Sequence, residues 1–178
     1  MAANSGDALE RARRVRLMVF DVDGVMTDGR LWYGPEGETL KQFHSHDGHG
    51  LKMLAASGVT SAILSGRRSA AVERRAAELG IAHVLQGIED KRAAWEALIA
   101  RLGLPAEATG YAGDDVVDLP VLSRCGFACA TREAPRAVRE RVHYVCEAPA
   151  GGGAVRELCE LLLRAQGTLD AALARYLA

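Results

Sequence analysis

The sequence lacks the features that would assign the protein to a membrane or to nucleic acid. Its 22 basic and 23 acidic side chains leave a formal charge of −1 over 178 residues, which gives no general nucleic-acid-binding footprint. No apolar run approaches the ~18–20 residues that a membrane-spanning helix needs. We therefore expect neither nucleic acid nor a membrane among its partners.

Cysteine is also scarce, and so is any sign of a targeting segment. The four cysteines, Cys125, Cys129, Cys146 and Cys159, do not follow the paired spacing of zinc or redox sites. Buried thiols in a reducing compartment are the simplest interpretation. Residues 1–16 have no apolar core before their arginines, so we expect a short frayed lead-in and not a secretory signal. These features predict a cytoplasmic protein.

The residues that are present have a globular composition, with 49% hydrophobic and 25% charged side chains. The length suits one domain, which we expect to span 1–178. Apolar runs rich in β-forming residues are expected to be strands at 15–20, 59–64, 81–85, 109–112, 126–130 and 142–146. Helical patterns occupy 48–57, 69–79, 91–102, 116–124, 154–166 and 169–177. This alternation predicts an α/β fold with a doubly wound, mostly parallel, Rossmann-like sheet.

One insert, at about 30–43, interrupts the alternation. Two short strands are expected at 30–33 and 39–43, on either side of Gly34-Pro35-Glu36-Gly37, which is a strong hairpin signal. The aromatic pair Trp32 and Tyr33 makes this hairpin a candidate contact between subunits. The last residues, about 167–178, are expected to form a C-terminal tail.

Polar residues follow the first four strands of the expected sheet. The carboxyl ends of parallel strands meet at one rim, where open α/β sheets bind their ligands. The residues expected at this rim are Asp21, Asp23, Ser65, Gly66, Arg67, Lys91, Asp114 and Asp115.

Four of these side chains are carboxylates, and their mutual repulsion calls for a metal. At ~4 Å and an effective dielectric near 20, each like-charge pair costs about 4 kcal/mol, which Lys91 alone cannot offset. Mg²⁺ would offset it, because this hard cation binds a few carboxylates while it retains water. Ser65, Lys91 and backbone N–H groups at turns suit phosphate oxygens. The set indicates phosphoryl transfer, although any single Asp after a strand is more often only a helix N-cap.

The order of these groups resembles the four motifs of the haloacid dehalogenase superfamily of phosphatases. Asp21-Val22-Asp23-Gly24-Val25-Met26-Thr27-Asp28-Gly29 is similar to the first motif. The second, third and fourth motifs are matched by Ser65-Gly66-Arg67, by Lys91 and by Gly113-Asp114-Asp115-Val116-Val117-Asp118.

Within that superfamily, the chain from about 15 to 176 resembles the phosphatases of 3-deoxy-D-manno-octulosonate 8-phosphate. A short hairpin stands where other branches have a large cap. Narrower marks of the resemblance are Asp47-Gly48-His49-Gly50, Gly153-Ala154-Val155-Arg156-Glu157 and Ala165-Gln166-Gly167. The resemblance implies hydrolysis of this sugar phosphate in lipopolysaccharide precursor synthesis.

The resemblance also implies catalytic roles, which the rim alone leaves unassigned. Asp21 would attack phosphorus and form an aspartyl-phosphate. Asp23 would protonate the leaving sugar oxygen and then deprotonate the hydrolytic water. Ser65 and Lys91 would bind the phosphoryl oxygens.

A metal site and a binding site for the sugar acid are implied in the same way. Mg²⁺ would be held by the Asp21 carboxylate, the Asp23 backbone carbonyl and Asp114, while Asp115 and Asp118 would support the metal site and orient Lys91. Neighbouring subunits of a homotetramer would close the cap-less site. The implied substrate-binding residues are Asp23, His44, Ser45, His46, Asp47, Gly48, Lys52, Gly66, Arg67, Arg75 and Lys91.

Two positions depart from the family pattern. His44-Ser45-His46 stands where the family commonly has Asn-x-Arg, so a fixed cation is replaced by a group that titrates near neutrality. Gly152 stands where a basic residue is common. His44, His46 and His49 also suggest a zinc site, since His44 and His46 would share one face of a strand. The carboxylate-rich rim nevertheless favours a hard cation.

Three other functions fit parts of the pattern. A related nine-carbon sugar acid phosphate is an alternative substrate. A receiver-like signalling switch also combines Asp, a hydroxyl, Lys and Mg²⁺, but its acidic pair follows the first strand, whereas Asp114-Asp115 comes late here. An inactive binding relative is a third alternative, although none of the expected catalytic residues is missing.

Overall fold

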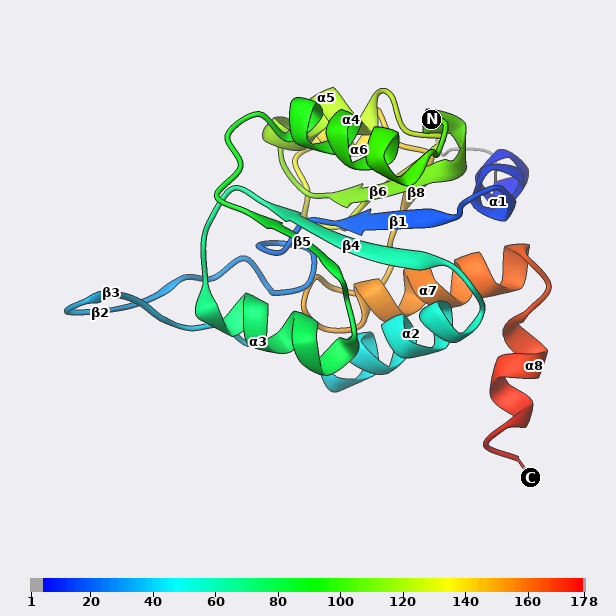
Figure 1. Ribbon diagram of the computed structural model, residues 1–178, viewed down its shortest axis with the longest axis horizontal. Coiled ribbons are helices and arrows are strands. Elements are labelled where there is room, and N and C mark those ends of the chain that lie inside the picture. Colours follow the sequence, from blue (N-terminus) through cyan, green and yellow to red (C-terminus); the bar gives the residue numbers. More distant parts are fainter. Residues whose placement is uncertain (1–4, 178) are drawn as a thin grey trace.

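The computed structural model describes residues 5–177, which form a six-stranded sheet between two layers of helices (Figure 1). The strand order is β5-β4-β1-β6-β7-β8, and every neighbouring pair is parallel. This arrangement confirms the expected doubly wound α/β fold. The strands are β1 (Leu17–Phe20), β4 (Thr60–Ser65), β5 (His83–Gln86), β6 (Thr109–Gly113), β7 (Phe127–Ala130) and β8 (Tyr144–Val145).

The central strand β1 is buried on both faces and therefore separates two cores. Leu17 and Val19 face one cluster of buried residues, and Met18 and Phe20 face the other. In Figure 1, α4 (Lys91–Leu102), α5 (Leu119–Leu122) and α6 (Arg136–Arg139) cover one face of the sheet. The other face is covered by α2 (Ser45–Ala56), α3 (Ala70–Leu79) and α7 (Ala154–Ala165), and α8 (Leu169–Ala174) extends beyond it.

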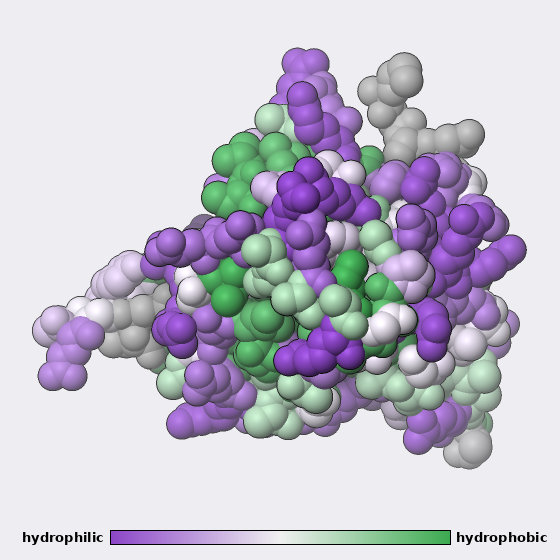
Figure 2. Space-filling view, turned by 45° about the horizontal axis from the view of Figure 1, so that its top comes forward, coloured by the Kyte–Doolittle hydropathy of each residue, from purple (hydrophilic) through white to green (hydrophobic). Residues whose placement is uncertain are grey.

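The predicted hairpin projects from one end of the sheet as β2 (Trp32–Gly34) and β3 (Gly37–Leu40) (Figures 1 and 2). Trp32, Tyr33 and Leu40 are more than half exposed on it. In Figure 2, the green hydrophobic patches lie on the body of the molecule between purple polar side chains, and the coloured part of the projection is mainly purple to pale. The apolar character that the hairpin exposes is thus confined to these three side chains.

Helix ends follow the sequence signals closely. Asp90 caps α4 by accepting a hydrogen bond from the Ala93 amide. Gly80 and Gly103 end α3 and α4 in the left-handed conformation, with φ of 72° and 63°. The helix predicted at 116–124 is divided into a 3₁₀ turn at Val116–Asp118 and α5, with Pro120 in the first turn of α5.

Several predicted boundaries were wrong. Residues 5–13 are not a frayed lead-in but helix α1 (Ser5–Arg13), which buries Ala8 and Ala12; residues 1–4 lie outside the described part. The second hairpin strand ends at Leu40 and does not reach Phe43. Helix α2 begins at Ser45, earlier than predicted, because His44 already has the extended conformation of an N-cap.

All four cysteines are buried free thiols, as expected. Over residues 5–177, no helix combines the length and the apolar character needed to cross a membrane.

Candidate active site

The predicted rim residues come together in a cavity of about 350 Å³ beyond the strand ends, which we call the catalytic cavity. They arrive from loops that follow β1, β4 and β6 and from the first turn of α4, because the parallel topology aligns these ends. The cavity is lined by Asp21, Asp23, Gly29, Leu31, Ser65, Gly66, Arg67, Lys91, Asp114, Asp115 and Val117.

Lys91 is the centre of a buried ion-pair network. Its Nζ lies 2.8 Å from Asp21 Oδ2 and 2.6 Å from Asp118 Oδ1. The Lys91 side chain is only 5% exposed and the Asp118 side chain is fully buried. A buried ammonium is stable only with such partners, so its position is strongly fixed.

Asp118 also organises the loop that carries Asp114. Its Oδ1 accepts a hydrogen bond from the Tyr111 hydroxyl, and its Oδ2 accepts the backbone amides of Asp114 and Asp115. The Asp115 carboxylate caps the 3₁₀ turn by accepting from the Val116 amide. Asp115 is therefore an N-cap residue that also lines the catalytic cavity.

The charge balance of the cavity leaves carboxylates in excess. Burial and repulsion from Asp118 raise the pKa of Asp21 to about 6, against the opposing effect of Lys91. Burial and the carboxylates of Asp21 and Asp118 raise the pKa of Asp114 to about 7. Burial lowers the pKa of Lys91, but Asp21 and Asp118 outweigh burial and raise it overall.

The same carboxylates fit a hard divalent cation. Oxygens of Asp21, Asp114 and Asp118 lie within 4.8 Å of one another. Asp118 is fully buried and accepts four hydrogen bonds, whereas Asp21 accepts two, so Asp21 and Asp114 are the better ligands. A Cβ on Gly24, where φ is +81°, would lie 2.1 Å from Asp114 Oδ2, so glycine leaves room for this carboxylate. A positive ion here would relieve the repulsion that raises both pKa values.

Asp23 lies at the edge of the network and has cationic partners of its own. Its Oδ1 is 2.5 Å from Lys41 Nζ, and its Oδ2 is 3.7 Å from Arg67 Nε. Lys41 directly follows the hairpin and was not among the predicted site residues. Its only sequence signal is a lone cation in a strand-like segment, which is commonly a solvated residue.

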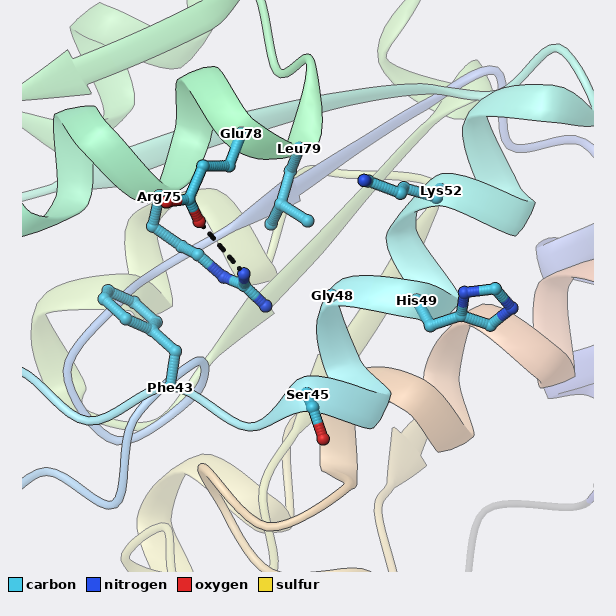
Figure 3. A pocket seen from close by; sticks show the side chains of 8 residues that line it. All are labelled: Phe43, Ser45, Gly48, His49, Lys52, Arg75, Glu78 and Leu79. Atoms are coloured by element: carbon cyan, nitrogen blue, oxygen red, sulfur yellow. Dashed lines mark hydrogen bonds and ion pairs between the residues drawn. The ribbon is translucent and has the colours of Figure 1, made fainter.

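A second cavity, of about 500 Å³, gathers other predicted substrate-binding residues, and we call it the α2–α3 pocket (Figure 3). Ser45, Gly48 and Lys52 come from α2 and Arg75 from α3. Arg75 points toward Gly48, where a Cβ would lie 2.1 Å from the guanidinium Nη2. The remaining lining residues are Phe43, His49, Glu78 and Leu79. None of the eight lines the catalytic cavity, so the structure divides the predicted substrate set in two.

The other predicted binding residues line neither cavity. Asp47 is 3% exposed, and its Oδ1 accepts a hydrogen bond from the Arg156 amide at the start of α7. His44 and His46 do not lie on a strand, because α2 begins between them, although their rings meet edge to face at 4.9 Å. Among the described residues, only one group of Asp, Glu, His or Cys side chains is arranged so that it could hold a metal ion. It consists of Asp21, Asp114 and Asp118. The zinc alternative therefore gains no support.

Comparisons with known proteins add independent information, although no protein-family model matches the chain. The chain is 43% identical over 166 residues to the 3-deoxy-D-manno-octulosonate 8-phosphate phosphatase KdsC of Yersinia pestis, covering 93% of this chain and 89% of that protein. It is 42% identical over 168 residues to KdsC of Escherichia coli K12, with 94% and 89% covered.

Solved structures agree with these sequence relatives. A probable YrbI family phosphatase from Pseudomonas syringae superposes with a TM-score of 0.95 at 51% identity, covering 97% of this chain and 98% of the other. The Moraxella catarrhalis 3-deoxy-D-manno-octulosonate 8-phosphate phosphatase, in complex with a magnesium ion, a phosphate ion and a KDO molecule, gives a TM-score of 0.94 at 40% identity, covering 97% and 99%. With the motifs in place and this similarity over nearly its whole length, the chain belongs to the 3-deoxy-D-manno-octulosonate 8-phosphate phosphatase family of the haloacid dehalogenase superfamily.

Proposed function

We propose that a single domain of 178 residues hydrolyses 3-deoxy-D-manno-octulosonate 8-phosphate to the free sugar acid and phosphate, with Mg²⁺ as cofactor. The observation that carries this proposal is Lys91, which bridges Asp21 and Asp118 beside Asp114 in the catalytic cavity. The family relatives at over 40% identity support the substrate.

In the first step, the Asp21 carboxylate attacks phosphorus and the bond to the sugar oxygen breaks. Asp21 suits this role because Lys91 and the Val22 amide hold its two oxygens from different sides. Asp23, two residues further on the turn, donates a proton to the leaving sugar oxygen. Lys91 and Ser65 provide donors for the phosphoryl oxygens, where negative charge concentrates.

In the second step, water hydrolyses the aspartyl-phosphate. Asp23, now a carboxylate, takes a proton from this water, and phosphate leaves with restoration of Asp21. Asp118 keeps Lys91 in place through both steps, because its carboxylate is itself fixed by Tyr111 and two backbone amides.

Asp21, Asp114 and the backbone carbonyl of Asp23 would hold the Mg²⁺. When bound, the ion supplies positive charge that neutralises the phosphoryl group and the clustered carboxylates.

The sugar acid carries a carboxylate as well as the phosphate, so it needs cationic partners beyond the metal. Arg67 lines that cavity, whereas Lys52 and Arg75 line the α2–α3 pocket. We propose that neighbouring subunits of a homotetramer bring the α2–α3 pocket of one chain toward the catalytic cavity of another. The exposed apolar hairpin residues and the missing cap support this assembly. The proposed location is the cytoplasm, in agreement with the four free thiols.

A phosphate-release screen over a panel of sugar phosphates, with and without Mg²⁺, tests the function. The expected result is Mg²⁺-dependent release that is fastest with 3-deoxy-D-manno-octulosonate 8-phosphate. Faster turnover of the nine-carbon analogue would change the proposed substrate but not the proposed reaction. A stable phosphoprotein without turnover would favour the signalling switch. Light scattering tests the tetramer, and an active monomer at assay concentration would contradict it.

A further inference from the structure

Lys41 is a buried cation that the mechanism above does not use. It follows β3 directly, where the hairpin returns to the body of the protein. Its side chain is 2% exposed and its Nζ lies 2.5 Å from Asp23 Oδ1. An ammonium group loses several kcal/mol of hydration when it is buried, so a charge partner at this distance strongly fixes its position.

The second carboxyl oxygen of Asp23 also has a cationic partner. Its Oδ2 lies 3.7 Å from Arg67 Nε, and Arg67 Nη1 donates to the Tyr33 hydroxyl on the hairpin at 2.9 Å. The Asp23 side chain is 20% exposed and lines the catalytic cavity. Two cations connected to the hairpin therefore restrict how this carboxylate can rotate.

We propose that Lys41 is a positioning residue, whose ammonium donates to Asp23 Oδ1 and so holds the Asp23 carboxyl group in the orientation in which it transfers a proton to the leaving sugar oxygen. This inference rests on the proposed function, in which Asp23 is the acid and base. The effect of orientation is large, because misplacing a reacting group by about 1 Å can cost about 10²-fold in rate. The alternative is a plain anchor for the hairpin, and the two roles predict different kinetics.

The leaving group separates the two roles. A sugar alkoxide leaves poorly and needs a proton, whereas p-nitrophenolate leaves without help. We expect Lys41→Met to slow aspartyl-phosphate formation from the sugar phosphate by about 10²-fold and from p-nitrophenyl phosphate by less than about 5-fold, with KM for the sugar phosphate nearly unchanged. Lys41→Arg should recover most of the loss. Single-turnover kinetics with both substrates measure these rates.

A double-mutant cycle with Asp23→Asn tests whether Lys41 acts through Asp23. The expected result is that Lys41→Met has little further effect once Asp23 is replaced. The matched control is Arg136→Met, which breaks an exposed pair with Glu140 on α6 and should leave both rates unchanged. If Lys41→Met does not fold, Lys41→Gln takes its place, because glutamine removes the charge but keeps a hydrogen-bond donor. The same losses in rate with the two substrates are expected for Lys41→Gln.

Equal losses with both substrates, or additive losses in the cycle, would overturn the positioning role and leave Lys41 as an anchor. This outcome is distinct from failure of the proposed function. If the unmodified enzyme hydrolyses a different alkyl phosphate, the same cycle is run with that substrate and still decides the role of Lys41.

Discussion

The catalytic cavity and the α2–α3 pocket hold their charged side chains in different ways. In the catalytic cavity, Lys91 is 5% exposed and binds carboxylates 70 and 27 residues away in sequence. In the α2–α3 pocket, Arg75 is 23% exposed and forms an ion pair with Glu78, one helical turn away. Pairs of the second kind contribute little to stability. Tertiary ion pairs thus fix the charged side chains of the catalytic cavity, whereas Arg75 in the α2–α3 pocket is held by a local pair.

The largest effect is expected from Asp21→Asn, which removes the proposed nucleophile from the catalytic cavity. Turnover should fall by about 10⁴-fold or more, as for other enzymes without their nucleophile. Asp28→Asn is the matched control, because Asp28 is an exposed residue of the same loop. Phosphate release measures the loss, and circular dichroism checks the fold. Near-normal turnover by Asp21→Asn would remove Asp21 from the nucleophile role.

Gly24→Ala tests how precisely the fold places Asp114. The new methyl group would meet the Asp114 carboxylate, so Mg²⁺ affinity should fall by about 10–100-fold, as when the support of a ligand is lost. Gly58→Ala is the control, since its φ is +94° with no atom within 4 Å of an added Cβ. Both variants should lose about 1–2 kcal/mol from the left-handed conformation. Calorimetric Mg²⁺ titration that finds equal affinities would show that Asp114 moves freely.

Arg75→Met tests the α2–α3 pocket in the same way. If the α2–α3 pocket binds the sugar acid, the variant should raise KM by about 10-fold and leave kcat nearly unchanged, since binding is lost without loss of chemistry. Arg74→Met is the control on the same helix, because Arg74 is exposed and does not line the pocket. Steady-state kinetics give both constants. A fall in kcat at constant KM would instead place Arg75 among the groups that act in the transition state.

The two sites also differ in how far the sequence predicts them. Asp21, Ser65, Lys91 and Asp114 each end a strand, follow one or open a helix, so the strand order alone brings them together. Lys91 was placed correctly to the residue because Asp90 and Gly103 mark both ends of α4.

The α2–α3 pocket was not predicted as a separate site, because it depends on where α2 begins. Without an N-cap side chain at His44, nothing in the sequence placed the first turn at Ser45. The hydrogen bond from the Arg156 amide to Asp47 joins residues 109 apart in the sequence, so no local pattern could predict it. The ion pair of Lys41 with Asp23 is likewise a tertiary contact. Helix α1 was missed for a simpler reason, since Ala8 and Ala12 bury too little apolar surface to give a clear pattern.

The smallest predicted effect is a pH dependence of Mg²⁺ stabilisation, which arises only in the catalytic cavity. The pKa values of Asp21 and Asp114 are about 6 and about 7 in the folded protein, above the ordinary 3.8. The folded state therefore binds protons more tightly than the unfolded state, which stabilises the metal-free protein below pH ~4. That contribution is lost as the pH rises through 6 and 7, where the carboxylates lose their protons and become free to bind Mg²⁺.

The Tm increase caused by Mg²⁺ should be about 4 °C larger at pH 8 than at pH 5, which corresponds to ~1–2 kcal/mol for a chain of this size. Thermal unfolding with and without Mg²⁺ measures the difference, and Asp114→Asn should remove most of it. A Tm increase that is the same at both pH values would mean that protons and Mg²⁺ do not compete for these carboxylates.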